Sequence, residues 1–201
     1  MMSDEFRMAE DESGDKGGGD GGLLKQMLKA RSILISEAVS DKLARRVQSQ
    51  LILMQMDDEK SPITVYINSP GGSADSGFAI YDALRFFKPP VRTIVNGLCA
   101  SAAIIIHLAA PKERRYSLPN GRFLIHQPST FVQGSASDIQ INAEEIVKLR
   151  ERYNQIVGEE CGNKTMEQVT KDADRDFWLS PEEAKKYGLV GKVIKNIGEL
   201  G

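Results

Sequence analysis

The chain has 201 residues, enough for one domain with a core large enough to fold alone. Its formal net charge of −2 argues against nucleic acid as the main partner, because phosphate binding favours a basic surface. The longest apolar run, residues 100–111, is interrupted by Ser101 and His107 and is too short to cross a membrane. The two cysteines, Cys99 and Cys161, are expected to be reduced, buried thiols of a cytoplasmic protein.

The first 23 residues differ in composition from the rest. Seven acidic residues stand against two basic ones, and the segment closes with GDKGGGDGG. Such a Gly-rich, acidic stretch cannot offset the entropy of ordering, so residues 1–23 are expected to be a disordered tail and residues 24–201 a single domain. A signal peptide needs a basic start and an apolar stretch, so none is expected here.

The first half of the domain alternates β-rich and helical segments. Apolar residues recur at helical spacing in the first long helix, for example at Leu43, Val47 and Leu51, and Ser40 is a suitable N-cap. A Pro-Pro pair after residue 88 ends the second helix. In chain order, the predicted elements are a strand at 32–35, a helix at 41–58, a strand at 63–68, a helix at 78–87 and a strand at 91–96.

The second half continues this alternation. Ser180, Pro181 and Glu183 form a helix start with a capping residue, a proline in the first turn and a glutamate three residues after the cap, and Gly188 ends that helix. The predicted elements are an apolar helix from about 101, a strand at 122–126, a polar-faced helix at 137–160, a helix after 180 and a strand at 189–194. This order predicts an α/β fold of parallel βαβ units but does not fix the strand order.

Ser101 follows a strand, a glycine and two small residues, and it opens a helix in NGLCASAAIII. This position exposes a hydroxyl at the end of a sheet, beside the free N–H groups and positive dipole of a helix start, which can stabilise an oxyanion. A helix cap or a buried hydroxyl is the alternative, because serine is a favoured cap. The stretch alone does not decide between a cap and a nucleophile.

A second strand end carries NSPGGS, residues 68–73. Two glycines allow positive φ angles and close approach of another backbone, so the turn can present N–H groups to a carbonyl oxygen or pair with an extended chain. A tight turn with no further role is the alternative. The glycine spacing and the missing lysine exclude a P-loop and a dinucleotide fingerprint.

A serine nucleophile needs a base, and the chain has two histidines. His107 lies six residues after Ser101 in the same predicted helix and points away from it, which favours a packing or interface role. His126 ends an apolar strand and can face the same edge as Ser101. His126 is therefore the better candidate, although a lone histidine is more often structural.

An acid to orient His126 is available in KDADRDFWLS, which holds Asp172, Asp174 and Asp176 around Arg175. A solvated charge run with Arg175 paired locally is the alternative. Asp176 directly precedes Phe177-Trp178-Leu179, and at the edge of this apolar patch its carboxylate is expected to be partly buried and to need a partner.

These stretches together resemble the Clp protease proteolytic subunit. The motifs are LLKQMLKARSILI, YINSPGGSADSGFAIYDALRFFKPPVRTIVNGLCAS, FLIHQPS and KDADRDFWLSPEEAKKYGLV, and the similarity runs over residues 24–194. The resemblance implies a Clp/crotonase-type α/β fold with a protruding helical arm. It also implies a serine endopeptidase that works in two stacked heptameric rings on unfolded proteins delivered by an AAA+ ATPase.

The resemblance assigns roles to individual residues. It implies Ser101 as nucleophile, His126 as base, Asp176 as orienting acid, and the backbone N–H groups of Gly72 and Ala102 as oxyanion donors. It further implies substrate pairing along 72–74 and 128–130, with Ser73, Ala74, Pro128 and Ser129 as substrate-binding residues, and a ring-to-ring contact through Asp174 and Arg175. No metal or cofactor is expected; the partner would use ATP, since the chain has no Walker-type loop.

The chain also departs from the family pattern. Ala102-Ala103 replaces Met-Gly, Leu98-Cys99 replaces Gln-Ala, and Ser129-Thr130-Phe131 stands where glycines are common. Thr64 replaces an aromatic residue of the ATPase-docking pocket, while Tyr66 remains, and the tail lacks the apolar axial loop. Because of these changes, the alternative remains that the chain is a proteolytically weak or inactive structural or regulatory subunit of a mixed ring. A crotonase-type enzyme acting on acyl-CoA thioesters is a third possibility that rests on fold analogy alone.

Overall fold

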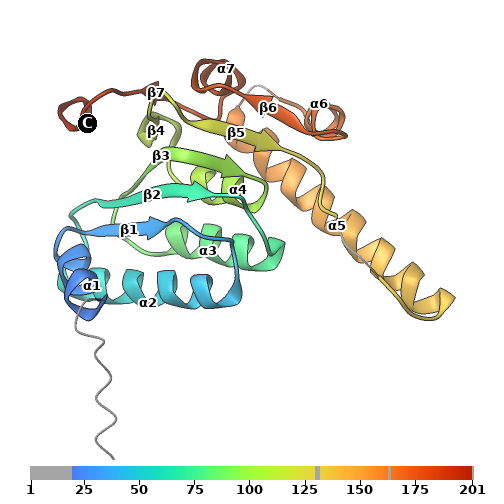
Figure 1. Ribbon diagram of the computed structural model, residues 1–201, viewed down its shortest axis with the longest axis horizontal. Helices are drawn as coiled ribbons and strands as arrows, with labels where there is room; N and C mark the ends of the chain where they lie inside the picture. Colours follow the sequence, from blue (N-terminus) through green and yellow to red (C-terminus); the bar gives the residue numbers. More distant parts are fainter. Residues whose placement is uncertain (1–19, 130–131, 163, 201) are drawn as a thin grey trace, which may run out of the picture.

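The computed structural model describes residues 20–129, 132–162 and 164–200 (Figure 1). Its strands are β1 (Ser32–Ile35), β2 (Ile63–Ser69), β3 (Val91–Ala100), β4 (Arg115–Ser117), β5 (Arg122–Ile125), β6 (Phe177–Leu179) and β7 (Lys192–Val193). Its α-helices are α1 (Asp20–Lys29), α2 (Asp41–Asp57), α3 (Ala74–Phe86), α4 (Ala102–Leu108), α5 (Ala136–Cys161), α6 (Met166–Asp172) and α7 (Pro181–Tyr187), with short 3₁₀ turns at Lys112–Arg114 and Ile197–Glu199. The α/β class predicted from the alternation is confirmed.

The strands form one largely parallel sheet in the order β1-β2-β3-β4-β7. Strand β3 changes partner along its length: its residues 93–95 pair with β4, and its residues 98–100 pair with β5. Strand β6 then pairs with β5 in antiparallel orientation. The sheet therefore divides at β3, and the part that carries β5 and β6 begins where β3 leads into α4.

Helices cover the sheet and close the core (Figure 1). Figure 1 shows α2 and α3 running along β1 and β2, with α4 beside β3. Helix α2 buries Leu43, Val47 and Leu51, the helical-spacing set expected from the sequence. Helix α4 is buried along its whole length, as its apolar composition predicts. None of the described helices combines the length and the apolarity needed to cross a bilayer.

Helix α5 forms the protruding arm (Figure 1). A capping box between Ser135 and Asp138 starts the helix, and Gly162 ends it at φ 70° after 26 residues. Only its C-terminal part is buried, through residues such as Tyr153, Val157 and Cys161. The arm is thus anchored at one end to the domain and exposed at the other.

The helix starts predicted from capping residues are confirmed, whereas several boundaries are corrected. Helix α1 begins at Asp20, so residues 20–23 do not belong to the tail; residues 1–19 lie outside the described residues. Strand β3 extends to Ala100 rather than 96, because pairing with β5 continues it. Strands β4 and β6 and helix α6 were not predicted, since elements of three to seven residues leave little periodicity to read.

A buried arginine joins four parts of the fold. Arg115, 1% exposed, donates to the carbonyl oxygens of Ala110, Leu108 and Glu160 at 2.6, 3.1 and 2.8 Å and pairs with the Glu160 carboxylate. That carboxylate also accepts from Tyr81 at 3.0 Å and from Arg85. Burial lowers the pKa of Arg115, and the Glu160 charge opposes that shift.

Removing the Glu160 charge should destabilise the fold strongly. Glu160→Gln leaves the buried Arg115 guanidinium without a counter-ion, and the free energy of unfolding should fall by about 3 to 5 kcal/mol. Chemical denaturation measures this change. Glu59→Gln is the matched control, because the Glu59–Lys88 pair is exposed and its loss should change stability by less than about 1 kcal/mol. Equal effects of the two substitutions would contradict this role of Glu160.

Candidate active site

Ser101 stands between β3 and α4 in a conformation that L-residues rarely adopt. Its φ is 55° and its ψ is −125°, and within the described residues only Arg31 is another non-glycine with positive φ. Its hydroxyl makes no capping hydrogen bond, although it occupies the N-cap position of α4. The helix-cap interpretation of Ser101 is therefore wrong, and the side chain is free for another role.

Three hydrogen bonds hold the backbone of this turn. The Ser101 N–H donates to the Leu124 carbonyl of β5 at 2.9 Å. The Ser101 carbonyl accepts from the Ile104 N–H at 2.9 Å and from the Tyr153 hydroxyl at 3.3 Å. Burial raises the pKa of Tyr153 well above its ordinary range, so its phenol remains a donor. Strand β5, helix α4 and helix α5 thus jointly fix the strained residue, as strained sites require.

The glycine turn after β2 lies directly against this serine. A Cβ on Gly71, which has φ 85°, would stand 2.6 Å from the Ser101 Cβ and 3.0 Å from the Ala102 nitrogen. Gly72, at φ 148°, is held by a parallel bridge to Val39, whose carbonyl oxygen a Cβ would meet at 2.3 Å. Ser73 then caps α3 by accepting from the Ser76 N–H at 3.2 Å. Both glycines are needed for close approach, as the sequence indicated.

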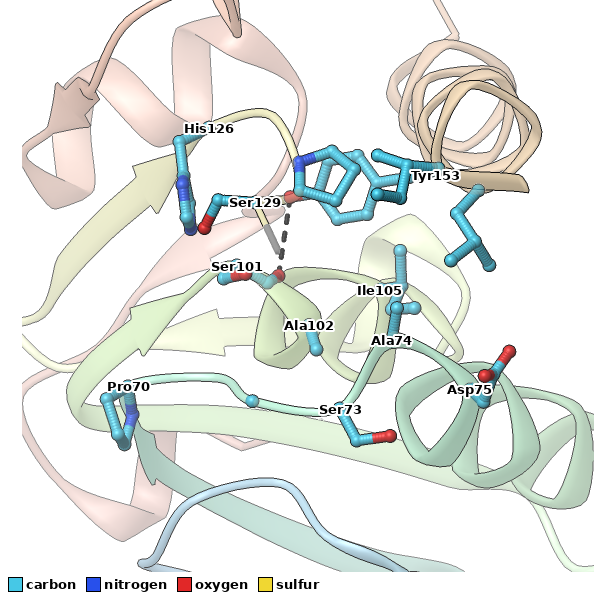
Figure 2. A pocket seen from close by; sticks show the side chains of 14 residues that line it. Pro70, Ser73, Ala74, Asp75, Ser101, Ala102, Ile105, His126, Ser129 and Tyr153 are labelled. Carbon is cyan, nitrogen blue, oxygen red and sulfur yellow. Dashed lines mark hydrogen bonds between the residues drawn. The ribbon is translucent and has the colours of Figure 1, made fainter. Parts of the chain in front are cut away.

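The two strand ends border a cleft of about 410 Å³ (Figure 2). Figure 2 shows Ser101 and Ala102 on one side of it, His126 above them and Tyr153 on the α5 side. Its lining also includes Ile105 of α4 and Ile146 of α5. The predicted site residues that line the cleft are Gly72, Ser73, Ala74, Ser101, Ala102, His126, Pro128 and Ser129. The structure therefore brings together eight residues that are spread over nearly 60 positions of the sequence.

The two histidines have different environments, as predicted. His126 is half-buried at the end of β5 and lines the cleft with Ser101. His107 is fully buried in α4 and packs against Phe123 with 5.9 Å between the ring centroids. Burial, with a smaller contribution from the Arg115 charge, lowers the pKa of His107 to about 3, so its imidazole is neutral. Of the two histidines, His126 alone is placed to act as a base in the cleft.

Asp176, the predicted orienting acid, lies one residue before the paired part of β6. Strands β5 and β6 pair Ile125 with Phe177, and this antiparallel register, continued by one residue, sets His126 opposite Asp176. Asp176 is exposed, so the prediction of a partly buried carboxylate is wrong, because the chain enters the edge strand β6 at the surface. Within the described residues, the side chains of Ser101, His126 and Asp176 make no hydrogen bond to one another.

Asp172 and Asp174, the acids close to Asp176 in the chain, make other contacts. The Asp172 carboxylate accepts from the Tyr187 hydroxyl at 3.0 Å, so it has a partner other than His126. Asp174 and Arg175 are exposed, and the Asp174 carbonyl accepts from the Gln127 side chain at 3.1 Å. No salt bridge between Arg175 and an acid is found among the described residues, which does not support the alternative of a charge run with Arg175 paired locally. Thr130, predicted to flank the substrate, lies outside the described residues.

Tyr153, Gly71 and the apolar wall of the cleft were not predicted. Tyr153 and Ile146 lie on a helix that the sequence describes only as polar-faced, and they reach the cleft through the packing of α5 on the domain. Gly71 was noted only as one glycine of a turn. No local signal marks these residues, since their contacts join segments tens of residues apart. In the described part of the chain, no group of three or more His, Cys, Asp or Glu side chains is gathered as a metal site requires.

Comparisons with known proteins place this chain in a family. The model of the Clp protease family matches residues 20–197. The chain is 47% identical over 191 residues to ATP-dependent Clp protease proteolytic subunit 2 of Pseudomonas aeruginosa, covering 94% of each chain. It is 45% identical over 186 residues to the subunit 2 of Treponema denticola, covering 92% of each.

A solved structure agrees with these matches. A ClpP1 mutant from Listeria monocytogenes superposes with a TM-score of 0.82 at 43% identity, covering 89% of this chain and 99% of that one. The fold and the matched relatives define a Clp-type peptidase subunit. The chain belongs to the Clp protease family, and nothing in the comparisons favours the inactive-subunit alternative.

Filling the space at Gly71 should disable the cleft. In Gly71→Ala the new Cβ must displace the Ala100 carbonyl or Ser101, and a shift of about 1 Å at a reacting group can cost about 100-fold in activity. We expect a loss of peptidase activity of that order, measured with a fluorogenic peptide. Gly162→Ala is the control, because its φ is also positive at 70° but a Cβ there meets nothing within 4 Å. It should cost about 1 to 2 kcal/mol of stability and leave activity per folded subunit unchanged.

His107 should contribute to acid sensitivity. Its pKa is near 6.5 in the unfolded chain and about 3 in the fold, so the unfolded state binds more protons between these values and stability falls as pH falls through this window. His107→Leu should flatten the dependence of the unfolding free energy on pH between about 6.5 and 3. Denaturation curves across this range test it, and parallel pH dependences of variant and wild type would contradict it.

Proposed function

We propose that the chain is a serine endopeptidase in which Ser101, His126 and Asp176 are nucleophile, base and orienting acid. The observation that carries this proposal is the strained Ser101, whose uncapped hydroxyl lines one cleft with His126. A serine on a sharp strand-to-helix turn, exposed at the end of a sheet, is the geometry that nucleophilic hydrolases use. The family match supports a peptidase, and the cleft supplies residues for the serine mechanism.

The chemistry follows from these positions. His126 takes the Ser101 proton as the hydroxyl oxygen attacks a peptide carbonyl carbon, and it then gives that proton to the leaving amine. Asp176 holds the imidazole tautomer and stabilises the imidazolium from its place across the β5–β6 register. Water, activated by the same histidine, hydrolyses the acyl-enzyme. Because the three side chains are not hydrogen-bonded here, their alignment belongs to the substrate-bound or assembled state.

The negative charge of the tetrahedral intermediate falls between two backbone donors. Ala102 is the first residue of α4, so its N–H has no intrahelical partner, and the Gly72 N–H lies on the other strand end of the cleft. Fixed donors of this kind stabilise an oxyanion without reorganisation. An extended substrate would pair with Gly72–Ala74 on one side and Pro128–Ser129 on the other, since the first segment runs from the glycine turn into the start of α3, the second is irregular backbone, and both border the cleft.

Assembly and partner are part of the same proposal. The curated relatives are named as proteolytic subunits of ATP-dependent Clp proteases, which supports a AAA+ ATPase that delivers unfolded chains. Two stacked heptameric rings, with Asp174 and Arg175 in the contact between rings, fit the exposure of both residues. The chain itself would bind no cofactor, and a cytoplasmic location stays a prediction from the sequence.

A fluorophosphonate probe should label Ser101 covalently in the assembled protein. The adduct would be located by mass spectrometry of the peptide that contains residue 101, and Ser101→Ala should lose both the label and at least about 1,000-fold of peptidase activity. Asp176→Asn should keep the label site but lower kcat by about 100-fold or more, because the imidazole tautomer is no longer fixed.

Ser49→Ala is the matched control, since this hydroxyl lies on the exposed face of α2 and bonds only the Arg45 carbonyl at 2.9 Å. It should label and cleave like the wild type. Wild-type protein that assembles but takes no label at Ser101, or that keeps its activity in Ser101→Ala, would refute the serine mechanism.

A further inference from the structure

The peptide unit that links Ser101 to Ala102 carries two groups that matter to the proposed reaction. Its N–H is the oxyanion donor, and its carbonyl accepts the Tyr153 hydroxyl and the Ile104 N–H. In a trans peptide the carbonyl and the N–H point in opposite directions, so whatever fixes one fixes the other. The orientation of the donor is therefore set by the partners of the Ser101 carbonyl.

The observed orientation leaves Ser101 strained. At φ 55° and ψ −125°, Ser101 lies outside the regions allowed to L-residues. Rotating this peptide unit by about 180° would bring ψ of Ser101 to about +55°, the ordinary left-handed region, but it would also turn φ of Ala102, the first residue of α4, to a positive value. That flip would turn the Ser101 carbonyl into the cleft and remove the donor, so the start of α4 and the partners of the Ser101 carbonyl together hold the native orientation.

Tyr153 is placed to supply such a contact. It is 6% exposed, it lies on α5 rather than on the turn itself, and its ring lines the cleft (Figure 2). The 3.3 Å between its hydroxyl and the Ser101 carbonyl is long for an O–H···O bond, which indicates a modest contribution. Gly71 leaves the opposite side open, since a Cβ there would stand 3.0 Å from the Ala102 nitrogen.

We propose that Tyr153 is a positioning residue that holds the Ser101–Ala102 peptide with its N–H toward the oxyanion, and so ties the helical arm to catalysis. This inference rests on the proposed serine mechanism and adds to it a residue that does not touch the reacting atoms. A purely packing role of Tyr153 in the lining of the cleft would need only its phenyl ring, whereas the positioning role needs its hydroxyl.

The test compares Tyr153→Phe with wild type in the assembled full-length protein. Activity of a fluorogenic peptide is expressed per Ser101 titrated with the fluorophosphonate. We expect kcat to fall about 3- to 10-fold, the value of one modest hydrogen bond, with KM changed less than about 2-fold. A peptide aldehyde, whose adduct with serine places an oxygen in the oxyanion site, should lose affinity by the same factor. The pH profile should not move, since the phenol does not titrate.

Tyr81→Phe is the matched control. Tyr81 is also buried, and its hydroxyl bonds the Glu160 carboxylate at 3.0 Å, but it does not line the cleft. It should lower stability while leaving kcat per titrated site unchanged. Tyr153→Leu is the second variant if Tyr153→Phe does not assemble, and it should show the same fall in kcat and in aldehyde affinity.

The outcomes distinguish a failure of the Tyr153 role from a failure of the proposed serine mechanism. A kcat per site within 2-fold of wild type, a rise in KM alone, or an equal fall in Tyr81→Phe would overturn the positioning role while leaving the serine mechanism intact. Failure of the wild type to label at Ser101 would instead refute the proposed mechanism, and the role of Tyr153 with it.

Discussion

Strand β3 pairs with β4 along its first half and with β5 along its second, and the site depends on this change of partner. The second pairing sets Ala100 beside Leu124 of β5, whose carbonyl accepts from the Ser101 N–H. Ser101 therefore lies at the end of the sheet, with a positive φ. The same pairing brings the end of β5, and with it His126, to the same cleft. Without the change of partner, Ser101 and His126, the proposed nucleophile and base, would lie on strands that do not pair.

Helix starts could be predicted from the sequence because their signals are local. The side chains of Ser40 and Ser180, both predicted as caps, each accept from an N–H three residues later, so donor and acceptor lie within one turn of chain. The short strands β4 and β6 could not be predicted, since they exist only through pairing with distant partners. The exposure of Asp176 was mispredicted for the same reason, because neighbouring apolar residues say nothing about which strand edge the chain enters.

The site was predictable as a set of residues but not as a geometry. Ser101, His126 and Gly72 were assigned from a resemblance that uses motif order, and the cleft brings these residues together. Gly71 and Tyr153 carry no such motif, and their importance lies in distances to Ser101 that only the packed structure contains. Long-range contacts of this kind are invisible to periodicity, which reads one segment at a time.

The residues that depart from the family pattern near Ser101 are well packed. Ala102 and Ala103 are 3% and 0% exposed, and a Cβ on Gly77 of α3 would already stand 3.0 Å from the Ala102 Cβ. Helices α3 and α4 therefore meet closely in this chain, and a small residue at 102 suits that contact. Thr64, which stands where the family resembled often has an aromatic residue, is buried and accepts from the Arg92 side chain at 2.7 Å.

Three buried titratable groups close to the Ser101 turn are neutral. Burial raises the pKa of the Cys99 thiol and of the Tyr153 phenol and lowers that of His107, so none of the three carries a charge near neutral pH. Besides Tyr153, the titratable side chains in the described lining of the cleft are those of His126 and Asp75. An oxyanion formed at Ser101 would thus meet fixed backbone donors, while Cys99, Tyr153 and His107 add no charge beside it.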